Sequence, residues 1–348
     1  MGWELFKNYL IAKAKFKPDV FLYENNKSAS EAIKNQISKE LNAELQYINS
    51  ALVSAQNRNR FYVHNIPGVE QPKDRNIHLQ DILETGVVWL DKSYAYATRC
   101  TGAIISDTLK RHRHMMVAEP VPCLNHIKFL TDKEMNYMVR NISDGRNHFD
   151  FGYIHCSYKE KSQCLLANLY KGVPYNVLCE KMPDLIKDVI TIDEHQNLYF
   201  ENKKIYKVKD KELFINGVPY QIKLDDGYYF FRKLTPLECE RLQTMPDGYT
   251  EGVSSTQRYK CLGNGWTAEV IIHILSHMGV EKDHPIEVLS LYDGIGTGRY
   301  CLDKLGYTHV TYKAYEIDPY ATKIALKNYP DIIQCGDAFQ VRNDDWKF

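Results

Sequence analysis

The apolar and polar positions of this chain predict short helices and strands at both ends and a less regular middle. Near the N-terminus, apolar residues first recur at helical spacing, and Pro18 then breaks the pattern. Strand, helix and strand then follow one another with short links, which favours an open α/β sheet. The predicted elements are a helix over 3–15, a strand over 19–23 leading into Glu24, a helix over 28–41, and strands over 47–53 and 61–64.

The regular pattern breaks at Pro67-Gly68 and stays weak as far as Phe231. This middle segment has short apolar runs, turn residues and scattered basic and aromatic residues, with little helical periodicity. It predicts a smaller mixed domain inserted into the first.

A clear helix start follows at Leu234. Thr235 is suited to be the N-cap, Pro236 the first helical residue, and Glu238 the partner in a capping box. A second amphipathic helix is predicted over 267–278, and a polar linker over 279–285 separates it from the last part of the chain.

The last part opens with an apolar run at 288–291 that stops at three glycines, Gly294, Gly296 and Gly298. This pattern predicts a buried strand entering a tight turn, where a ligand can approach the backbone. Glu316 follows at the end of the next predicted strand, where an acidic residue is suited to hold ribose hydroxyls. Gly336-Asp337 follows at the end of a third predicted strand. The spacing favours a cofactor site but leaves nucleotide and S-adenosylmethionine both open.

Composition narrows the class of protein. The 44% hydrophobic and 25% charged residues are ordinary for a globular chain, and the formal net charge of zero gives no overall nucleic-acid signature. Nine cysteines without a Cys-x-x-Cys pair favour reduced thiols over disulfides or zinc. No run approaches transmembrane length, and no metal site is expected. These features predict an intracellular protein.

Several candidate residues have an ordinary structural interpretation when taken singly. Glu24 could be a solvated carboxylate, and Arg58 and Arg60 could be surface cations. The basic run 110–114 is more often a solvated face, and its histidines lack a metal-binding pattern. Cys123, after Pro122, is better interpreted as a loop or core cysteine than as a nucleophile.

Together, however, the motifs resemble those of DNA cytosine-5 methyltransferases. In the first part of the chain, motif six is matched by Glu24-Asn25-Asn26 and motif eight by Gln56-x-Arg58-x-Arg60. After the middle segment, motif nine is matched by Leu234-Thr235-Pro236-x-Glu238 and motif ten by Gln257-Arg258-Tyr259-x-x-Leu262-Gly263-Asn264. In the last part, motif one is matched by Asp293-Gly294-Ile295-Gly296-x-Gly298, motif two by Tyr315-Glu316-Ile317-Asp318 and motif three by Gly336-Asp337. The versions at 65–68 and 263–266 are similar to phage-type and animal de novo enzymes. The resemblance implies an S-adenosylmethionine-dependent enzyme with a Rossmann-like α/β sheet that methylates C5 of cytosine in double-stranded DNA, as restriction-modification enzymes do. It also implies the cytoplasm of a bacterial or phage-infected cell as the place of action.

The chain departs from the family in two ways. Its motifs begin at the sixth, reach the tenth and then start at the first, which implies a circular permutation. The fourth motif, a Pro-Cys strand end that carries the nucleophile, is missing, and the resemblance implies a complementing polypeptide that supplies it. Without that strand, neighbouring backbone groups lack partners, which is costly in a parallel sheet. A non-catalytic DNA- or cofactor-binding remnant or regulator, or a truncated gene product, are the alternatives.

The resemblance also implies domains and residue roles. The expected division is 1–66 and 232–278 for the second half of the catalytic domain, 67–231 for target recognition, 279–285 for the permutation linker and 286–348 for the cofactor-binding half. The implied catalytic residues are Glu24, Arg58 and Arg60. The implied cofactor-binding residues are Tyr292, Asp293, Gly294, Gly296, Gly298, Glu316, Ile317, Asp337, Asn264 and Trp266. The candidate DNA contacts are Arg99, Lys110, Arg111 and Arg113.

Overall fold

A computed structural model describes residues 2–95, 104–121, 190–192, 198–200 and 203–344. The chain forms two compact units. Unit 1 comprises Met1–Glu119, Ile222–Leu224 and Arg232–Phe348, and unit 2 comprises Pro120–Gln221 and Asp225–Phe231. The segment 67–231, predicted as one recognition domain, therefore contributes residues to both units.

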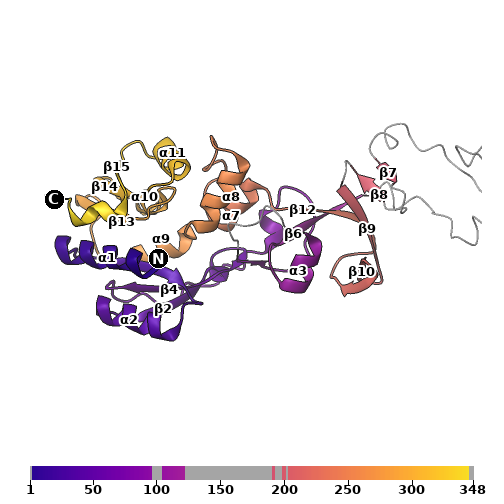
Figure 1. Ribbon diagram of the computed structural model, residues 1–348, viewed down its shortest axis with the longest axis horizontal. Helices are drawn as coiled ribbons and strands as arrows, with labels where there is room; N and C mark the ends of the chain where they lie inside the picture. Colours follow the sequence, from indigo (N-terminus) through magenta and orange to yellow (C-terminus); the bar gives the residue numbers. More distant parts are fainter. Residues whose placement is uncertain (1, 96–103, 122–189, 193–197, 201–202, 345–348) are drawn as a thin grey trace, which may run out of the picture. The chain divides into compact units, whose positions relative to one another are not determined.

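Many of the helices and strands of unit 1 are labelled in Figure 1. Its first part contains α1 (Gly2–Phe16), β1 (Leu22–Asn26), α2 (Glu31–Leu41), β2 (Leu45–Asn49), η1 (Ser50–Leu52), β3 (Gln56–Asn57), β4 (Asn59–His64), η2 (Leu79–Ile82), β5 (Ser93–Tyr94) and α3 (Ile105–Arg111). Its last part contains α7 (Pro236–Leu242), α8 (Ser255–Asn264), α9 (Ala268–Leu275), β13 (Ile286–Leu291), α10 (Thr297–Lys304), β14 (Val310–Tyr315), α11 (Pro319–Asn328), β15 (Ile333–Gly336) and η5 (Ala338–Arg342).

The principal strands of unit 1 form two separate three-stranded sheets, in the orders β1-β4-β2 and β13-β14-β15. In the first, β4 is antiparallel to both neighbours. In the second, all pairings are parallel. The mixed α/β class is thus confirmed. The expected single open sheet is not found among the described residues, because none of their strands pairs with both β13 and β1 to join the two sheets.

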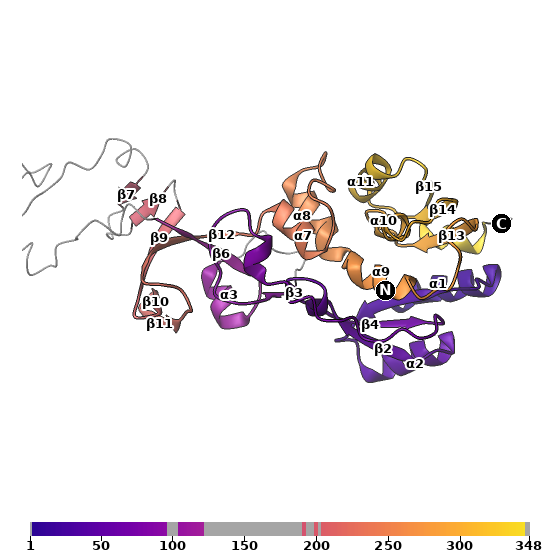
Figure 2. The ribbon, with the colours of Figure 1, turned by 180° about the vertical axis from the view of Figure 1, so that it is seen from behind.

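Helix α1 packs on both sheets with different parts of its length. Its Phe6 joins the core formed with α2 and the β1-β4-β2 sheet, which includes Ile37 and Phe61. Farther along, Ala12 packs with Tyr315 and other residues of the β13-β14-β15 sheet. Figures 1 and 2 show α1 drawn between the two sheets, with α10 and α11 on the opposite side of β13 and β14. A single helix therefore supports both half-sheets.

Local sequence signals were good guides to individual elements. Thr235 and Glu238 form the predicted capping box of α7, with Pro236 in its first turn. The predicted strand over 47–53 is only partly right. It ends at Asn49, whose side chain accepts a hydrogen bond from the Ala51 N–H and starts the 3-10 turn η1.

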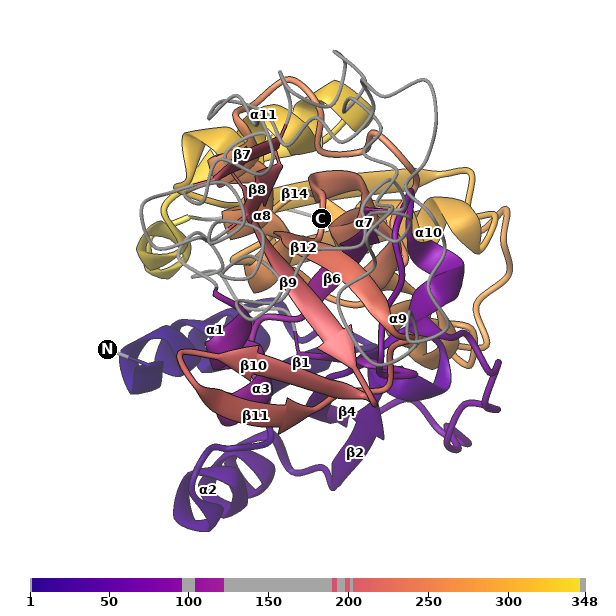
Figure 3. The same ribbon diagram turned by 90° about the vertical axis from the view of Figure 1, so that its right-hand side faces the viewer.

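The described residues of unit 2 form antiparallel β-strands, of which β9 to β12 are labelled in Figure 3. The chain enters it through β6 (Met116–Pro120) and returns through β12 (Gly227–Lys233). Between them lie β7 (Ile190–Ile192), β8 (Leu198–Phe200), β9 (Lys203–Lys209), β10 (Glu212–Ile215) and β11 (Val218–Gln221). In both units, none of the described helices has the length and apolar character needed to cross a membrane.

Candidate functional site

The acidic candidate and one of the arginines meet across two strands. Glu24 lies opposite Tyr62 in the β1–β4 register, so Arg60, two residues before Tyr62, is its diagonal neighbour. Arg60 Nε lies 2.8 Å from Glu24 Oε1, and the two side chains are only 15% and 17% exposed. The pair is thus a largely buried, charge-assisted contact rather than a surface ion pair.

Burial dominates the electrostatics of Glu24. It raises the pKa of the carboxyl above its ordinary value, although Arg60, Arg58 and a hydrogen bond from Trp266 each lower the pKa. The desolvation of the charged form therefore outweighs two nearby guanidinium groups. Glu24 keeps its proton to a higher pH than a solvated glutamate, which suits a group that must donate a hydrogen bond or a proton.

Arg58 holds a turn that comes from far along the sequence. Its side chain is 4% exposed, and Nη2 donates to the carbonyl oxygen of Gly265 at 2.8 Å. Burial and the neighbouring Arg60 lower the pKa of Arg58 to about 10. The Gly263–Trp266 segment, which ends α8 and turns away from it, is thereby fixed beside the Glu24–Arg60 pair.

The glycine turn after β13 is tied to the end of β14. The Gly294 N–H donates to Glu316 Oε2 at 2.8 Å, and Glu316 Oε1 accepts from the N–H groups of Ile317 and Asp318. Gly294 and Gly296 have φ values of +65° and +78°, a region that favours glycine. A Cβ on Gly294 would meet nothing within 4 Å, whereas one on Gly296 would crowd Ile332 and Ala325. Open space for a ligand therefore lies at Gly294.

Exposed apolar side chains surround the ends of these strands. Ile317 is 73% exposed, and Tyr292 and Phe339 are each 43% exposed. They follow β14, β13 and β15, respectively. Asp337 accepts a hydrogen bond from the Phe339 N–H, which fixes the start of η5. Exposed apolar groups beside fixed polar groups are the ordinary composition of a small-molecule site.

Helix α8 is tied to the same region by charge. Lys260 Nζ lies 2.7 Å from Asp318 Oδ2, just after Glu316 and Ile317. Asn264 at the end of α8 is exposed, and Trp266 is half-buried. The turn that Arg58 holds and the strand ends that carry Glu316 thus belong to one connected arrangement.

The predicted residues fall into two linked groups, while Gly298 and the candidate DNA contacts lie apart from both. Glu24, Arg58, Arg60 and Trp266 form the first group, and the cofactor candidates from Tyr292 to Gly296 with Glu316, Ile317 and Asp337 form the second. Gly298 is buried inside α10, away from the open space at Gly294. Lys110 and Arg111 lie at the end of α3 with Arg113 just beyond, all exposed, and Arg99 lies outside the described residues.

Two residues of this arrangement were not predicted. Asn8 of α1 is fully buried; its Nδ2 donates to Tyr292 Oη at 3.2 Å, and its Oδ1 accepts from Arg342 Nε at 3.0 Å. Tyr312 donates to Asp293. Asn8 could have been predicted because it is a polar residue on the apolar face of α1. The local sequence around Tyr312 gives no reason to select it. Within the described ranges, no group of three or more His, Cys, Asp or Glu residues could hold a metal ion.

Comparison with known proteins places these groups in a family context. The family model described as C-5 cytosine-specific DNA methylase matches residues 2–279. DNA (cytosine-5)-methyltransferase DRM2 of Oryza sativa subsp. japonica is 30% identical over 112 residues, which is 31% of this chain and 19% of that protein. DNA (cytosine-5)-methyltransferase DRM1 of Arabidopsis thaliana is 40% identical over 78 residues, 21% of this chain and 12% of that protein. Type II methyltransferase M.Sau3AI of Staphylococcus aureus is 47% identical over 49 residues, 14% of this chain and 11% of that protein.

The matched stretches thus span less than a fifth of each of these three relatives. The family model, by contrast, covers most of this chain, including Glu24, both arginines and the turn at Gly265. The chain belongs to the C-5 cytosine-specific DNA methylase family.

Proposed function

We propose that this chain is the larger part of a DNA cytosine-5 methyltransferase that transfers a methyl group from S-adenosylmethionine to C5 of cytosine in double-stranded DNA. The observation that carries the proposal is the buried Glu24–Arg60 pair, with its 2.8 Å contact, beside the turn that Arg58 holds at Gly265. In this arrangement the Glu24 carboxyl, whose pKa is raised, lies beside the Gly263–Trp266 segment, which we assign to the cofactor pocket. The family match supports the reaction class.

Glu24 would act on the target base. Cytosine must leave the stacked duplex before its ring atoms can be reached. Protonated Glu24 would donate to N3 of the flipped base and make C6 more electrophilic, and Arg60 would orient both the carboxyl and the base. A thiolate would then add to C6, and C5 would take the methyl group before its hydrogen leaves as a proton and the thiol is released.

The strand ends around Gly294 would hold the cofactor, whose contribution is an electrophilic methyl group. Gly294 and Gly296 would accommodate its methionine part, with Tyr292 and Asp293 beside them. Glu316 would accept from ribose hydroxyls, Ile317 would cover the adenine face, and Asp337 would accept from the adenine amino group. Asn264 and Trp266 would close the pocket. The exposed apolar surface of Ile317 and the open space at Gly294 support this assignment.

A permuted motif order accounts for the extent of the family match. The match ends at residue 279, where the polar linker over 279–285 begins. The glycine turn and Glu316 lie beyond that point, and Asp318, two residues after Glu316, pairs with Lys260 of α8. A cofactor half that follows the catalytic half in sequence, yet packs against it, is the expected result of circular permutation.

The two half-sheets support the need for a complementing strand. Among the described strands, β13 pairs only with β14 and β1 only with β4, so each has one free edge. Both strands are only partly buried, and α1 packs on both sheets at once. We propose that a segment of a second polypeptide, carrying a Pro-Cys strand end, pairs with β13 and β1 and completes one sheet in the order β15-β14-β13-segment-β1-β4-β2. It would bring the nucleophilic cysteine to the Glu24 side of the sheet.

Target recognition is assigned to 67–231. Unit 2 presents exposed lysines on β9, at 203, 207 and 209, which are suited to contact phosphates. Arg99, Lys110, Arg111 and Arg113 remain the predicted contacts of the rest of the segment. Both sets are expected to bind DNA with a strong dependence on salt concentration.

The test is methyl transfer from labelled S-adenosylmethionine to a cytosine-containing duplex by the chain, alone and with the Pro-Cys segment. Transfer to C5 with the segment, and its loss in Glu24→Gln, is the expected result. The alternative function is a non-catalytic cofactor- or DNA-binding regulator. Cofactor binding in calorimetry with no transfer in the complemented protein would support that function instead.

A further inference from the structure

The third glycine of the turn has a role that its place in the motif does not suggest. We infer that Gly298 lacks a side chain to make room for the hydroxyl of Tyr312, and that Tyr312 is a positioning residue that anchors the cofactor turn through Asp293. The positioning role rests on the proposed cofactor function. The role of Gly298 as a spacer does not.

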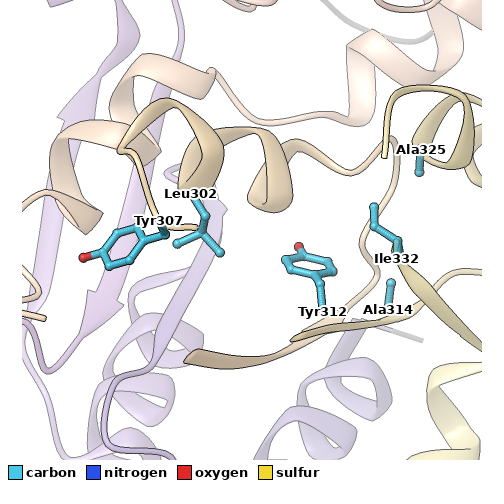
Figure 4. Packing of buried hydrophobic residues seen from close by; sticks show 6 residues of the cluster. All are labelled: Leu302, Tyr307, Tyr312, Ala314, Ala325 and Ile332. Atoms are coloured by element: carbon cyan, nitrogen blue, oxygen red, sulfur yellow. The ribbon is translucent and has the colours of Figure 1, made fainter. Parts of the chain in front are cut away.

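Tyr312 reaches the turn from inside the core. It lies on β14, is 1% exposed, and donates from Oη to Asp293 Oδ1 at 2.7 Å. Figure 4 shows its ring standing up from the strand among the aliphatic side chains of the core, including Leu302 and Ile332. A buried tyrosine hydroxyl needs a partner, and the Tyr312 hydroxyl has two, the carboxyl of Asp293 and the side chain of Ser290.

Gly298 lies beside that hydroxyl. A Cβ on Gly298 would be 2.4 Å from Tyr312 Oη but 3.4 Å from Cζ, the ring carbon that bears the hydroxyl. Unlike Gly294 and Gly296, it does not have a positive φ, and it lies within the first turn of α10. Backbone conformation therefore does not require glycine at this position. Glycine is required there because the Tyr312 hydroxyl oxygen occupies the space that a Cβ would need.

The anchored side chain belongs to a turn that other contacts also restrain, among them hydrogen bonds of the Asp293 side chain with the Ser290 side chain and the Gly296 backbone. Tyr292 has a φ of 61°, a left-handed conformation that is uncommon for a residue with a side chain. After it, the Asp293 N–H donates to the Tyr315 carbonyl oxygen at 3.2 Å and the Gly294 N–H to Glu316. The Tyr312–Asp293 contact adds a side-chain anchor at the middle of this sequence. Its loss would leave the approach to Gly294 less well fixed, so cofactor binding would have to order it.

A double-mutant cycle tests the spacer role. The unmodified chain, Gly298→Ala, Tyr312→Phe and the double variant are compared by thermal unfolding. Gly298→Ala is expected to lower the midpoint in the unmodified chain, because the methyl group meets the hydroxyl. It is expected to leave the midpoint unchanged or raise it in the Tyr312→Phe background, since the oxygen is gone and alanine is the better helix former. An equal loss in both backgrounds would overturn the spacer role.

Calorimetric titration with S-adenosylhomocysteine tests the positioning role. Tyr312→Phe is expected to weaken binding about tenfold, as loss of one hydrogen bond to a charged or buried carboxyl would. Tyr307→Phe is the matched control. It removes another buried tyrosine hydroxyl from the same core, one that donates to the Val280 carbonyl oxygen at 3.3 Å, and should leave the affinity unchanged.

Equal affinities for the Tyr312→Phe and Tyr307→Phe variants would overturn the positioning role. If the unmodified chain bound no S-adenosylhomocysteine, the proposed cofactor function would fail and the positioning role with it. The unfolding cycle would still decide whether Gly298 is a spacer.

Discussion

At the scale of single residues, the main feature is a carboxyl whose burial outweighs its ion pair. Glu24 contacts Arg60 and lies near Arg58, yet its pKa is raised. Taking a charge out of water can cost more than a nearby opposite charge returns. The arrangement stabilises the protonated acid, the form that the proposed chemistry uses.

The raised pKa of Glu24 predicts how stability changes with pH. The folded state binds the Glu24 proton more tightly than the unfolded state, so this group's contribution to the unfolding free energy falls as pH rises from the ordinary glutamate range through the folded-state pKa. Glu24→Gln has no such proton. Its unfolding midpoint should rise relative to that of the unmodified chain as pH increases from about 4, the ordinary range of a glutamate carboxyl.

Thermal unfolding at a series of pH values measures this difference. The charged and titratable groups that act on Glu24 or respond to it are Arg58, Arg60, Tyr62 and Tyr23. The pKa of Arg58, about 10, lies above the acid range, and burial raises the pKa of both tyrosines, so none of these three groups titrates with Glu24 there. A midpoint difference that moves in the opposite direction would mean that Glu24 has a lowered pKa.

Arg58 offers a second prediction. Arg58→Lys loses the planar group that reaches Gly265 while keeping the charge buried, and should lower the unfolding free energy by about 2 kcal/mol. Urea denaturation measures the change. Arg75→Lys is the control, because Arg75 and Glu269 form a more exposed pair whose loss is worth roughly 0–1 kcal/mol. Similar losses in the two variants would mean that the Gly265 contact contributes little.

At the scale of elements, the structure shows which features a local sequence determines. Helix α7 begins where three residues predicted it, because a capping box is made within four positions of the chain. The end of β2 was missed, since the choice between strand and 3-10 turn depends on the Asn49 side chain. Among the site residues, Gly298 was assigned to the cofactor with its neighbours through the motif resemblance, whereas the atom that a Cβ there would crowd belongs to Tyr312, which lies outside the motif.

The capping box gives a prediction at this scale. Thr235→Ala removes the acceptor of the Glu238 N–H and should lower the unfolding free energy by about 1 kcal/mol. Thr235→Ser keeps the oxygen and should recover most of that loss. Chemical denaturation of both variants is the measurement, and equal losses would show that the methyl group of Thr235, rather than its hydroxyl, stabilises the start of α7.

At the scale of the whole molecule, what remains to be explained is how two half-sheets form one catalytic domain. The local pattern predicted individual strands in each half, but their order and the free edges of β13 and β1 depend on pairing over long sequence distances. Helix α1 packs on both sheets, so it is suited to support a strand inserted between them. The account therefore predicts that the complementing segment binds through backbone hydrogen bonds to both edges.

Protection of backbone amides from hydrogen exchange tests that binding separately from catalysis. Amides of β13 and β1 should exchange more slowly once the Pro-Cys segment is added, while those of β11 in unit 2 should not change. Slower exchange only in unit 2, or no slowing at either β13 or β1, would exclude the inserted strand.

The most direct test of the central claim is C5 methylation of duplex DNA by the chain mixed with the Pro-Cys segment. The account predicts label on C5 of cytosine with the intact segment, and none with a Cys→Ser segment, with the Glu24→Gln chain, or with the chain alone. Equal methylation by the chain alone would contradict the complementing strand, and no methylation by the complemented protein that binds both cofactor and DNA would contradict the assignment of the chain as an enzyme.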